Sequence, residues 1–333
     1  MQKPDLVVID GDILAYRASA ANEKRHVKCV HKETAETVEF DTLTKFREWA
    51  GDTKDDYEIT PGQKAGKLEN AFHILNHMIG NITKACGASS YHIVVSGDTN
   101  FRLELPLPTK YKDSRKDTAK PLQLKDCKNY LINSHNAEVS DGVEADDVLV
   151  AYMTAGSTQA SIDKDAMHGP GWIYNWDTMT EPEHIAGIGE LFLIEKETAR
   201  KTAKGTPVIE KSIKGRGRMF LYYQMVYGDP VDAYKPCELA KAAFGEIGAY
   251  NLLKGCKTDK EALEAVARQY QVWYPQPLTY RAWDDSLQEN KSWIDIWQMY
   301  ADCAFMRRWD NDRFDVKKVL TKLGIIKKGE TDE

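Results

Sequence analysis

Apolar runs that end in acidic residues alternate with helical patterns over the first half of the chain. Residues 6–9 and 92–96 have the length and composition of buried strands. Between them, residues 68–85 repeat apolar side chains at helical spacing, and residues 13–21 fit a shorter helix. This alternation predicts an α/β fold in which a mostly parallel central sheet is flanked by helices.

The pattern changes twice along the chain. Residues 28–62 are polar and irregular, which indicates an insertion or hairpin to which we assign no function. A helix is predicted from Pro121 to about residue 134, because proline suits a first helical turn. Further strands are predicted near 158–162 and 172–175, and two runs are predicted to pair with each other, 191–194 and 207–209.

From about residue 218 the apolar spacing becomes helical. Helices are predicted at 218–227, 236–254, 258–270 and 292–308. Ser292 and Asp295 fit a capping pair, and the aromatic stripe that follows them is expected to pack in a core. The chain therefore divides into a predicted α/β domain over 1–215 and a predicted helical region over 216–333.

Acidic residues stand at the ends of several predicted strands. In a parallel sheet, ligands bind at the carboxyl ends of strands, so acids placed there can converge. Clustered carboxylates repel one another unless a cation neutralises them, and oxygen ligands suit Mg²⁺ or Mn²⁺. Any one segment alone also fits a loop acid or an acidic first helical turn. The nine candidates are Asp10, Asp98, Glu144, Asp146, Asp147, Asp163, Asp165, Asp229 and Asp232.

The net charge of −6 masks two basic stretches. Residues 110–128 hold seven bases against three acids, and residues 196–218 hold eight against two. Two divalent cations on the acids would reduce the net charge to about −2. The distribution of charge is therefore compatible with a nucleic-acid partner.

The cysteine content and the hydropathy of the sequence indicate the cellular compartment of the protein. The six cysteines form no Cys-x-x-Cys pair, which favours reduced thiols and argues against a zinc site or a disulfide framework. No apolar stretch reaches the length of a membrane span, and no signal peptide is evident. We expect a cytoplasmic protein with no membrane partner.

Several motifs, in one order, resemble the 5′-nucleases, a family that includes bacteriophage 5′–3′ exonucleases, flap endonucleases and the 5′-nuclease domain of bacterial DNA polymerase I. They span residues 8–232, about two-thirds of the chain. The matching pieces are Val8-Ile9-Asp10-Gly11, Gly97-Asp98, Phe101 to Pro106 with Tyr111 to Arg115, Gly142 to Asp147, Ser161 to Asp165, and Gly228-Asp229 with Asp232.

The resemblance implies a PIN-like sheet with a two-metal centre. It implies that one Mg²⁺ is held by Asp10, Asp98, Glu144 and Asp146. It implies that a second is held by Asp163, Asp165 and Asp229, with Asp147 and Asp232 binding waters around the ions. Mn²⁺ is expected to substitute for Mg²⁺.

The resemblance also implies how DNA is held. A basic arch is expected near 101–120, in which Lys112 and Arg115 contact the scissile phosphate and, with Asp146, serve catalysis. Arg102 is expected either to bind phosphate or to support the acids. The expected DNA-binding residues are Arg102, Tyr111, Lys112, Arg115, Lys116, Lys214, Arg216 and Arg218.

Two departures from the family pattern concern the helical region. Gln224 stands where the family has lysine, and Asp232 is followed by Ala233 where the family has asparagine. The helix–two-turn–helix that grips duplex DNA is therefore expected in divergent form, and K⁺ binding at this clamp is left open.

The activity implied is Mg²⁺-dependent hydrolysis of DNA in phage-type replication or recombination. The expected substrates are DNA with 5′ ends, flaps or nicks, and RNA–DNA hybrids, with replication proteins as partners. Three alternatives are kept: a haloacid-dehalogenase-like phosphatase using Asp10 as nucleophile, a PIN-type ribonuclease, and a non-catalytic nucleic-acid-binding protein. Activity on a small phosphoester but not on DNA would favour the first.

Overall fold

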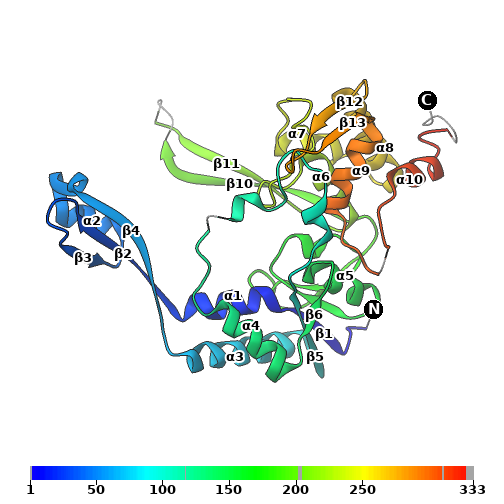
Figure 1. Cartoon of the computed structure of the whole chain (residues 1–333). Helices are drawn as coiled ribbons and strands as arrows, with labels where there is room; N and C mark the ends of the chain where they lie inside the picture. The colour runs from blue at the N-terminus through cyan, green and yellow to red at the C-terminus, as the bar shows by residue number, and fades with distance from the viewer. Residues whose placement is uncertain (1, 117, 202–204, 310, 328–333) are drawn as a thin grey trace.

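A computed structural model describes residues 2–116, 118–201, 205–309 and 311–327. Its centre is a six-stranded sheet in which five strands are parallel and only the edge strand β9 is antiparallel to its neighbour (Figure 1). The predicted α/β class with a mostly parallel sheet is confirmed. In spatial order the strands are β6 (Glu138–Ser140), β5 (Ser90–Ser96), β1 (Leu6–Asp10), β7 (Thr158–Ala160), β8 (Gly171–Tyr174) and β9 (Glu183–Ile185).

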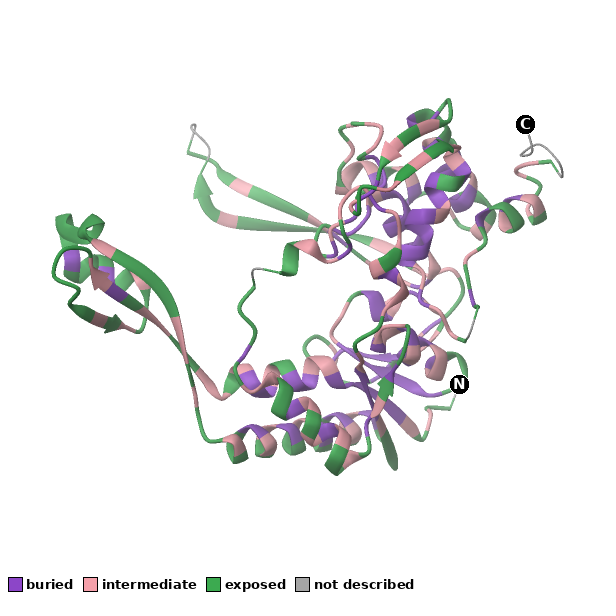
Figure 2. Cartoon of the chain, viewed as in Figure 1, coloured by how far each residue is buried: buried purple, intermediate pink, exposed green. Residues whose placement is uncertain are grey.

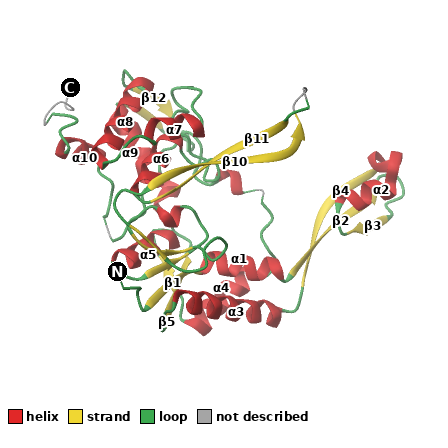
Figure 3. Ribbon diagram, turned by 180° about the vertical axis from the view of Figure 1, so that it is seen from behind, coloured by secondary structure: helices red, strands yellow, loops and turns green. Residues whose placement is uncertain are grey.

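Helices cover both faces of the sheet (Figure 3). Because successive strand residues point to opposite faces, Val7 and Ile9 of β1 pack in one core and Val8 packs in another. The first core contains residues of α1 (Gly11–Ala21), α3 (Leu68–Cys86) and α4 (Leu124–His135). The second contains Leu149 of α5 (Ala145–Thr154).

The polar insertion forms a separate arm with a small core of its own (Figure 1). Its core residues are Cys29, Phe46 and Ala50, and most of its other residues are exposed or only partly buried (Figure 2). The arm consists of β2 (Glu23–His31), β3 (Thr37–Phe40), α2 (Leu43–Ala50), a 3₁₀ turn (Gly51–Asp56) and β4 (Tyr57–Ala65).

A second projection is the long hairpin of β10 (Glu190–Lys201) and β11 (Pro207–Arg216). The predicted runs both lie in these strands, but they do not face each other. Leu191 pairs with Gly215, and Ile209 pairs with Glu197. Lys204, one base of the predicted basic stretch, lies outside the described residues.

The remaining elements are mainly helical and share one large core. They are α6 (Arg218–Tyr227), α7 (Glu246–Leu253), α8 (Asp259–Trp273), the pair β12 (Leu278–Arg281) and β13 (Leu287–Lys291), α9 (Trp293–Ala304) and α10 (Val316–Lys322). Trp297 and Tyr300 of α9 are fully buried, and Ser292 with Asp295 forms a capping box, as the sequence predicts.

Two helix predictions are too long. The helix expected over 236–254 is limited to α7, because the chain turns before it and Lys241 adopts a left-handed φ of 51°. The helix expected over 292–308 ends at Ala304, because Phe305 is extended. The domain boundary between 215 and 216 falls at the end of β11 and stays a prediction.

The segment predicted as a basic arch contains no α-helix among its described residues. It has two 3₁₀ turns, Phe101–Glu104 and Asp113–Arg115, joined by a loop with bends and a turn. Asp117 within it lies outside the described residues. Among the helices of the described ranges, none has the length and apolar character that crossing a membrane requires.

Candidate metal centre

The first acid of the site stands where β1 gives way to α1. Asp10 is the N-cap of α1, and its carboxylate accepts hydrogen bonds from the Ile13 amide (3.1 Å) and the Ser161 hydroxyl (2.8 Å). Gly11 allows the helix to start at once. A Cβ there would lie 2.5 Å from Cγ1 of Val95 and 2.7 Å from the carbonyl oxygen of Val94. The Asp10 carboxylate is thereby fixed at the carboxyl edge of the sheet.

The acids at the start of α5 divide between two environments. Glu144 and Asp146 line a pocket of about 120 Å³. Asp147 is fully buried and accepts hydrogen bonds from both terminal nitrogens of Arg102, at 2.7 and 2.9 Å. Its oxygens also accept bonds from the amides of Glu144 (3.0 Å) and Arg307 (2.7 Å). Asp147 thus fixes the first turn of the helix that carries the other two acids.

One pocket collects acids from segments far apart in the chain. It lies at the ends of β1 and β7 and at the start of α5, where the topology of a parallel sheet places ligand sites. Lys112 and Arg115 also line it. The acids that line it are Asp10, Asp12, Glu144, Asp146, Asp163, Asp165 and Asp232.

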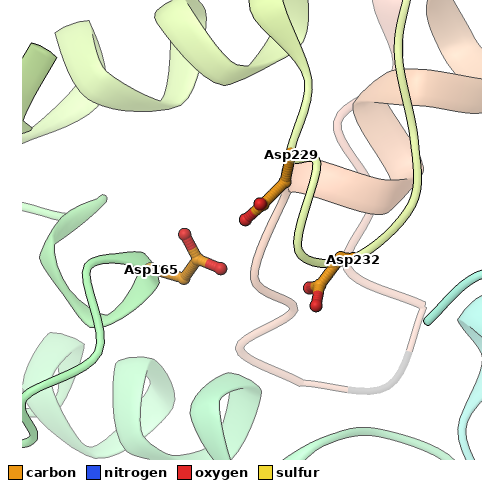
Figure 4. Close-up of side chains that lie close together, drawn as sticks. All are labelled: Asp165, Asp229 and Asp232. Atoms are coloured by element: carbon orange, nitrogen blue, oxygen red, sulfur yellow. The ribbon is translucent and has the colours of Figure 1, made fainter. Parts of the chain in front are cut away.

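Asp165, Asp229 and Asp232 form a compact buried group (Figure 4), and two of them, Asp165 and Asp232, also line this pocket. One carboxylate oxygen from each lies within 4.8 Å of the others, a separation that a single cation could bridge. Asp229 and Asp232 belong to a tight turn after α6. Gly228 opens it with a φ of 86°, and Asp229 is bridged to Tyr234.

Burial and mutual repulsion make several of these carboxyl groups weak acids. Burial, with the charge of Asp12, raises the pKa of Asp10 to about 7. Burial, with the charge of Asp163, raises the pKa of Asp165 to about 8. The pKa of Asp146 is raised well above its usual value by burial and by Asp10. Such a nest is stabilised by positive charge placed among its oxygens.

Glu144 behaves in the opposite way. Burial alone would raise its pKa, but Lys112 and Arg102 outweigh that effect and hold the pKa below its usual value. Lys112 forms an ion pair with Glu144, and its backbone amide donates to the Asp232 carbonyl at 2.9 Å. The arch is thus in direct contact with the acids.

A second cation and a phenol from the arch bind Asp232. Arg115 is 2.6 Å from one carboxylate oxygen of Asp232, and the Tyr111 hydroxyl donates to the other at 2.8 Å. Tyr111 is almost fully buried, so its hydroxyl serves the acids and has little surface to offer DNA.

Arg102 was expected either to bind phosphate or to support the acids, and its position fits the second role. Its guanidinium is fully buried between Asp147 and the carbonyl oxygens of Cys303 and Phe305. This burial leaves it no surface for a DNA phosphate, which corrects its inclusion among the DNA-binding residues.

The other candidates lie outside the pocket. Asp98 is exposed beyond the end of β5 and does not line it, so its role as a ligand stays a prediction. Lys116 is exposed and pairs with Asp113 at 3.2 Å. Lys214 is exposed on β11. Arg216 pairs with Glu183 and Glu190, and Arg218 pairs with Asp259.

Three residues at the site were not among the candidates. Asp12 lines the pocket and is 2.6 Å from Lys128. Lys164 is 2.5 Å from Asp229, and Gln224 donates to Asp165 at 2.5 Å. The sequence positions of Asp12 and Lys164 could have indicated them, since Asp12 follows Asp10 by two residues and Lys164 stands between Asp163 and Asp165. The contact of Gln224 depends on the packing of α6 and has no local signature.

The donor set fits a hard divalent cation. Every candidate ligand is a carboxylate, and the pocket-lining residues in the described chain include neither histidine nor cysteine. Oxygen-only donors suit Mg²⁺ or Mn²⁺ and do not suit Zn²⁺ or copper.

Comparison with known proteins adds little. No family model matches the chain, and no curated protein matches it in sequence. Among solved structures, the chain is similar to the crystal structure of the T5 D15 protein co-crystallized with metal ions. The two are 14% identical over 96% of this chain and 92% of that chain, with a TM-score of 0.45. Function has to be inferred from the site itself.

Proposed function

We propose that this protein is a metal-dependent 5′-nuclease that hydrolyses phosphodiester bonds in DNA, as a 5′–3′ exonuclease or a flap endonuclease. One observation carries the proposal. Acids from four separate segments line a single pocket, and Lys112 and Arg115 line the same pocket. Metal-assisted hydrolysis of phosphodiesters needs carboxylates that hold the metal ions, and cations beside them can bind the phosphate.

The acids would hold two Mg²⁺ ions, with Mn²⁺ as a substitute. Asp10, Glu144 and Asp146 would hold one, and Asp163, Asp165, Asp229 and Asp232 the other. When bound, such a pair lowers the pKa of the attacking water and stabilises charge on the attacking and leaving oxygens. Asp147 would act through Arg102 to keep Glu144 and Asp146 in position.

The arch would supply the remaining positive charge. The Lys112 ammonium and the Arg115 guanidinium face the pocket, where a phosphate bound by the acids' cations would lie. A fixed cation in such a place stabilises the charge that develops on the phosphoryl oxygens. Lys112 and Arg115 are therefore proposed to contact the scissile phosphate.

The proposed substrates are DNA with a free 5′ end, a flap or a nick, and RNA–DNA hybrids. The motif order in the sequence supports this choice, as do the exposed bases Lys116, one residue after the pocket-lining Arg115, and Lys214 on β11. Phage-type replication or recombination, in the bacterial cytoplasm with replication proteins nearby, is the proposed setting.

The test is digestion of 5′-labelled flap, nicked duplex and hybrid substrates with Mg²⁺, with Asp146→Asn as the inactive control. We expect metal-dependent release of short 5′ products by the wild type only. Hydrolysis of nitrophenyl phosphate without any cleavage of DNA would favour the phosphatase alternative. EDTA-insensitive DNA binding with no cleavage would favour the non-catalytic one.

A further inference from the structure

The arm joins the body at a cluster of exposed bases, here called the neck cluster: Lys24, Arg25, Lys64, Lys67 and Lys120. Lys24 of β2 lies directly opposite Lys64 of β4 in the strand register, so both side chains leave the same face of the ribbon. Lys67 follows the ribbon after two residues. Lys120 joins them because its carbonyl oxygen accepts a hydrogen bond from Gln63 at 3.0 Å.

Arg25 of the neck cluster forms an ion pair with Glu23, with 3.5 Å between its Nε and a carboxylate oxygen. In the described part of the chain, Lys24, Lys64, Lys67 and Lys120 make no salt bridge. The carboxylate of Glu23 is buried and already accepts bonds from the Leu122 amide (2.8 Å) and Gln63 (2.9 Å). Like charges placed directly across a strand pair are destabilising, so Lys24 and Lys64 carry a cost that an anion between them would remove.

Two helix N-termini meet at the same place. The side chain of Asn22 donates to the Lys67 carbonyl and to the Gln123 side chain, at 2.7 Å each. Lys67 and Gln123 are the N-cap residues of α3 and α4, and neither helix has a side-chain cap. The positive ends of two helix dipoles therefore lie beside Asn22, next to the start of β2 and the end of β4.

Some negative charge is also present. The C-terminus of α1 ends at Asn22, and the first turns of α3 and α4 contain Glu69 and Asp126. The end of α1 offsets one of the two helix dipoles. Asp41, whose pKa is lowered by Lys45 and also by Lys24, is a further acid close to the cluster. Five cationic side chains therefore stand against Glu69, Asp126, Asp41 and the buried Glu23.

We propose that the neck cluster is a second nucleic-acid contact, which binds backbone phosphates of the substrate DNA away from the cleavage site. This inference rests on the proposed function for the identity of the ligand. The cluster contains no aromatic side chain, so binding is expected to be independent of sequence.

The path of the chain connects the two sites. Arg115 lines the pocket of the metal centre, and Lys120, five residues further on in the sequence, contacts Gln63 at the neck. Five extended residues span at most about 17 Å, which is roughly five nucleotide steps of one strand. A strand whose phosphate occupies the pocket can therefore reach the neck cluster within half a turn of duplex.

The test compares two triple variants in an Asp146→Asn background, by fluorescence anisotropy with a 5′-flap DNA between about 50 and 200 mM salt. The neck variant is Lys24→Ala, Lys64→Ala and Lys120→Ala. The control carries the same change in charge at exposed lysines elsewhere, Lys32→Ala and Lys54→Ala at the arm tip and Lys84→Ala at the far end of α3.

We expect the neck variant to reduce the slope of log K against log salt by about 2 to 3, since each phosphate contact contributes about 0.7 to 0.9. The control should keep the wild-type slope. Without DNA, the neck variant should melt no lower than the wild type, because the Lys24–Lys64 repulsion is gone. Equal slopes for the neck and control variants would overturn the proposal.

Failure of this inference can be told apart from failure of the proposed function. DNA binding that depends on the neck lysines, in a wild-type protein that cleaves no DNA under any metal condition, would refute the nuclease and keep the neck site. DNA cleavage by the wild type, together with wild-type DNA binding by the neck variant, would keep the nuclease and refute the neck site.

Discussion

At the scale of single residues, the acids of the pocket differ in what holds them. Asp10 and Asp165 are buried among other carboxylates, which raises their pKa values to about 7 and about 8. Glu144 is held ionised by Lys112 and Arg102. The pocket therefore combines an excess of negative charge with cations at its rim, which suits it to bind metal and phosphate together.

Asp146→Asn is expected to reduce DNA cleavage by at least about a hundredfold while the fold stays intact. Residues that only support a metal ligand already cost about 10- to 100-fold when changed, and Asp146 is proposed to be a ligand itself. Steady-state cleavage of a labelled flap, with circular dichroism as a check on folding, measures this.

The matched control is Asp98→Asn, at an exposed acid outside the pocket. We expect it to retain more activity than Asp146→Asn. Equal losses in the two variants would contradict the assignment of Asp146, rather than Asp98, to the metal centre.

Lys112→Ala is expected to slow cleavage by about 10²- to 10³-fold, because it removes one fixed cation from the developing charge on the phosphate. Mn²⁺ affinity should not fall, since the ion pair with Glu144 competes with metal for the same carboxylate. Single-turnover kinetics and calorimetric Mn²⁺ titration separate the two effects. Lys116→Ala, at an exposed arch residue, is the control. An equal loss of rate in this variant would show that Lys112 acts only through its contribution to the surface charge.

At the scale of elements, the Arg102–Asp147 pair connects the start of the arch, the first turn of α5 and the chain after α9. Both side chains are fully buried. The pair therefore sets how the helical part lies against the helix that carries Glu144 and Asp146.

Arg102→Leu is expected to destabilise the protein by about 3–5 kcal/mol, because it leaves the Asp147 carboxylate buried without a partner. Urea unfolding followed by fluorescence measures this. The double variant Arg102→Leu with Asp147→Asn should recover part of the loss, because it removes the buried charge and keeps a side-chain oxygen for the amides of Glu144 and Arg307. A single variant as stable as the wild type would mean that the pair does not hold these elements together.

Much of the α/β part could be predicted from local patterns. The runs that form β1 and β5 and the spacing of α3 are explicit in the sequence, and so are the acids at the strand ends. The strands of the arm could not be predicted, because they carry few apolar side chains and the core of the arm has only three buried residues among those described. The helix predicted over 236–254, after the turn that carries Asp229 and Asp232, is limited to α7.

Of the site, the gathering of acids was predicted and the counter-charges were not. Lys112 and Arg115 were expected at a phosphate, but their contacts with Glu144 and Asp232 depend on how the arch packs. The family resemblance separated Asp146, as a direct ligand, from Asp147, but no local pattern in the sequence indicates that Asp147 is buried against Arg102.

At the scale of the whole molecule, the acid pocket links stability to pH and metal. The pKa values of Asp10 and Asp165 are higher in the folded chain than the value of about 4 expected when unfolded. Their protonation therefore favours the fold at low pH, and this contribution is lost as the pH rises through about 7 to 8. Divalent metal, which binds the ionised form, should reverse the loss.

We expect the melting temperature in EDTA to fall between about pH 5 and 8, and Mg²⁺ or Mn²⁺ to raise it more at pH 8 than at pH 5. Scanning calorimetry at several pH values measures both. In the double variant Asp10→Asn with Asp165→Asn, the pH dependence should flatten and the metal effect should shrink. A metal effect that is equal at all pH values would contradict the linkage.

The most direct measurement of the central claim is calorimetric titration of the metal-free protein with Mn²⁺, together with its Asp146→Asn and Asp229→Asn variants. The account predicts two ions per chain in the wild type, and the loss of at least one ion in each variant. An absence of saturable binding in the wild type, or wild-type stoichiometry in both variants, would contradict the assignment of this pocket as a two-metal centre.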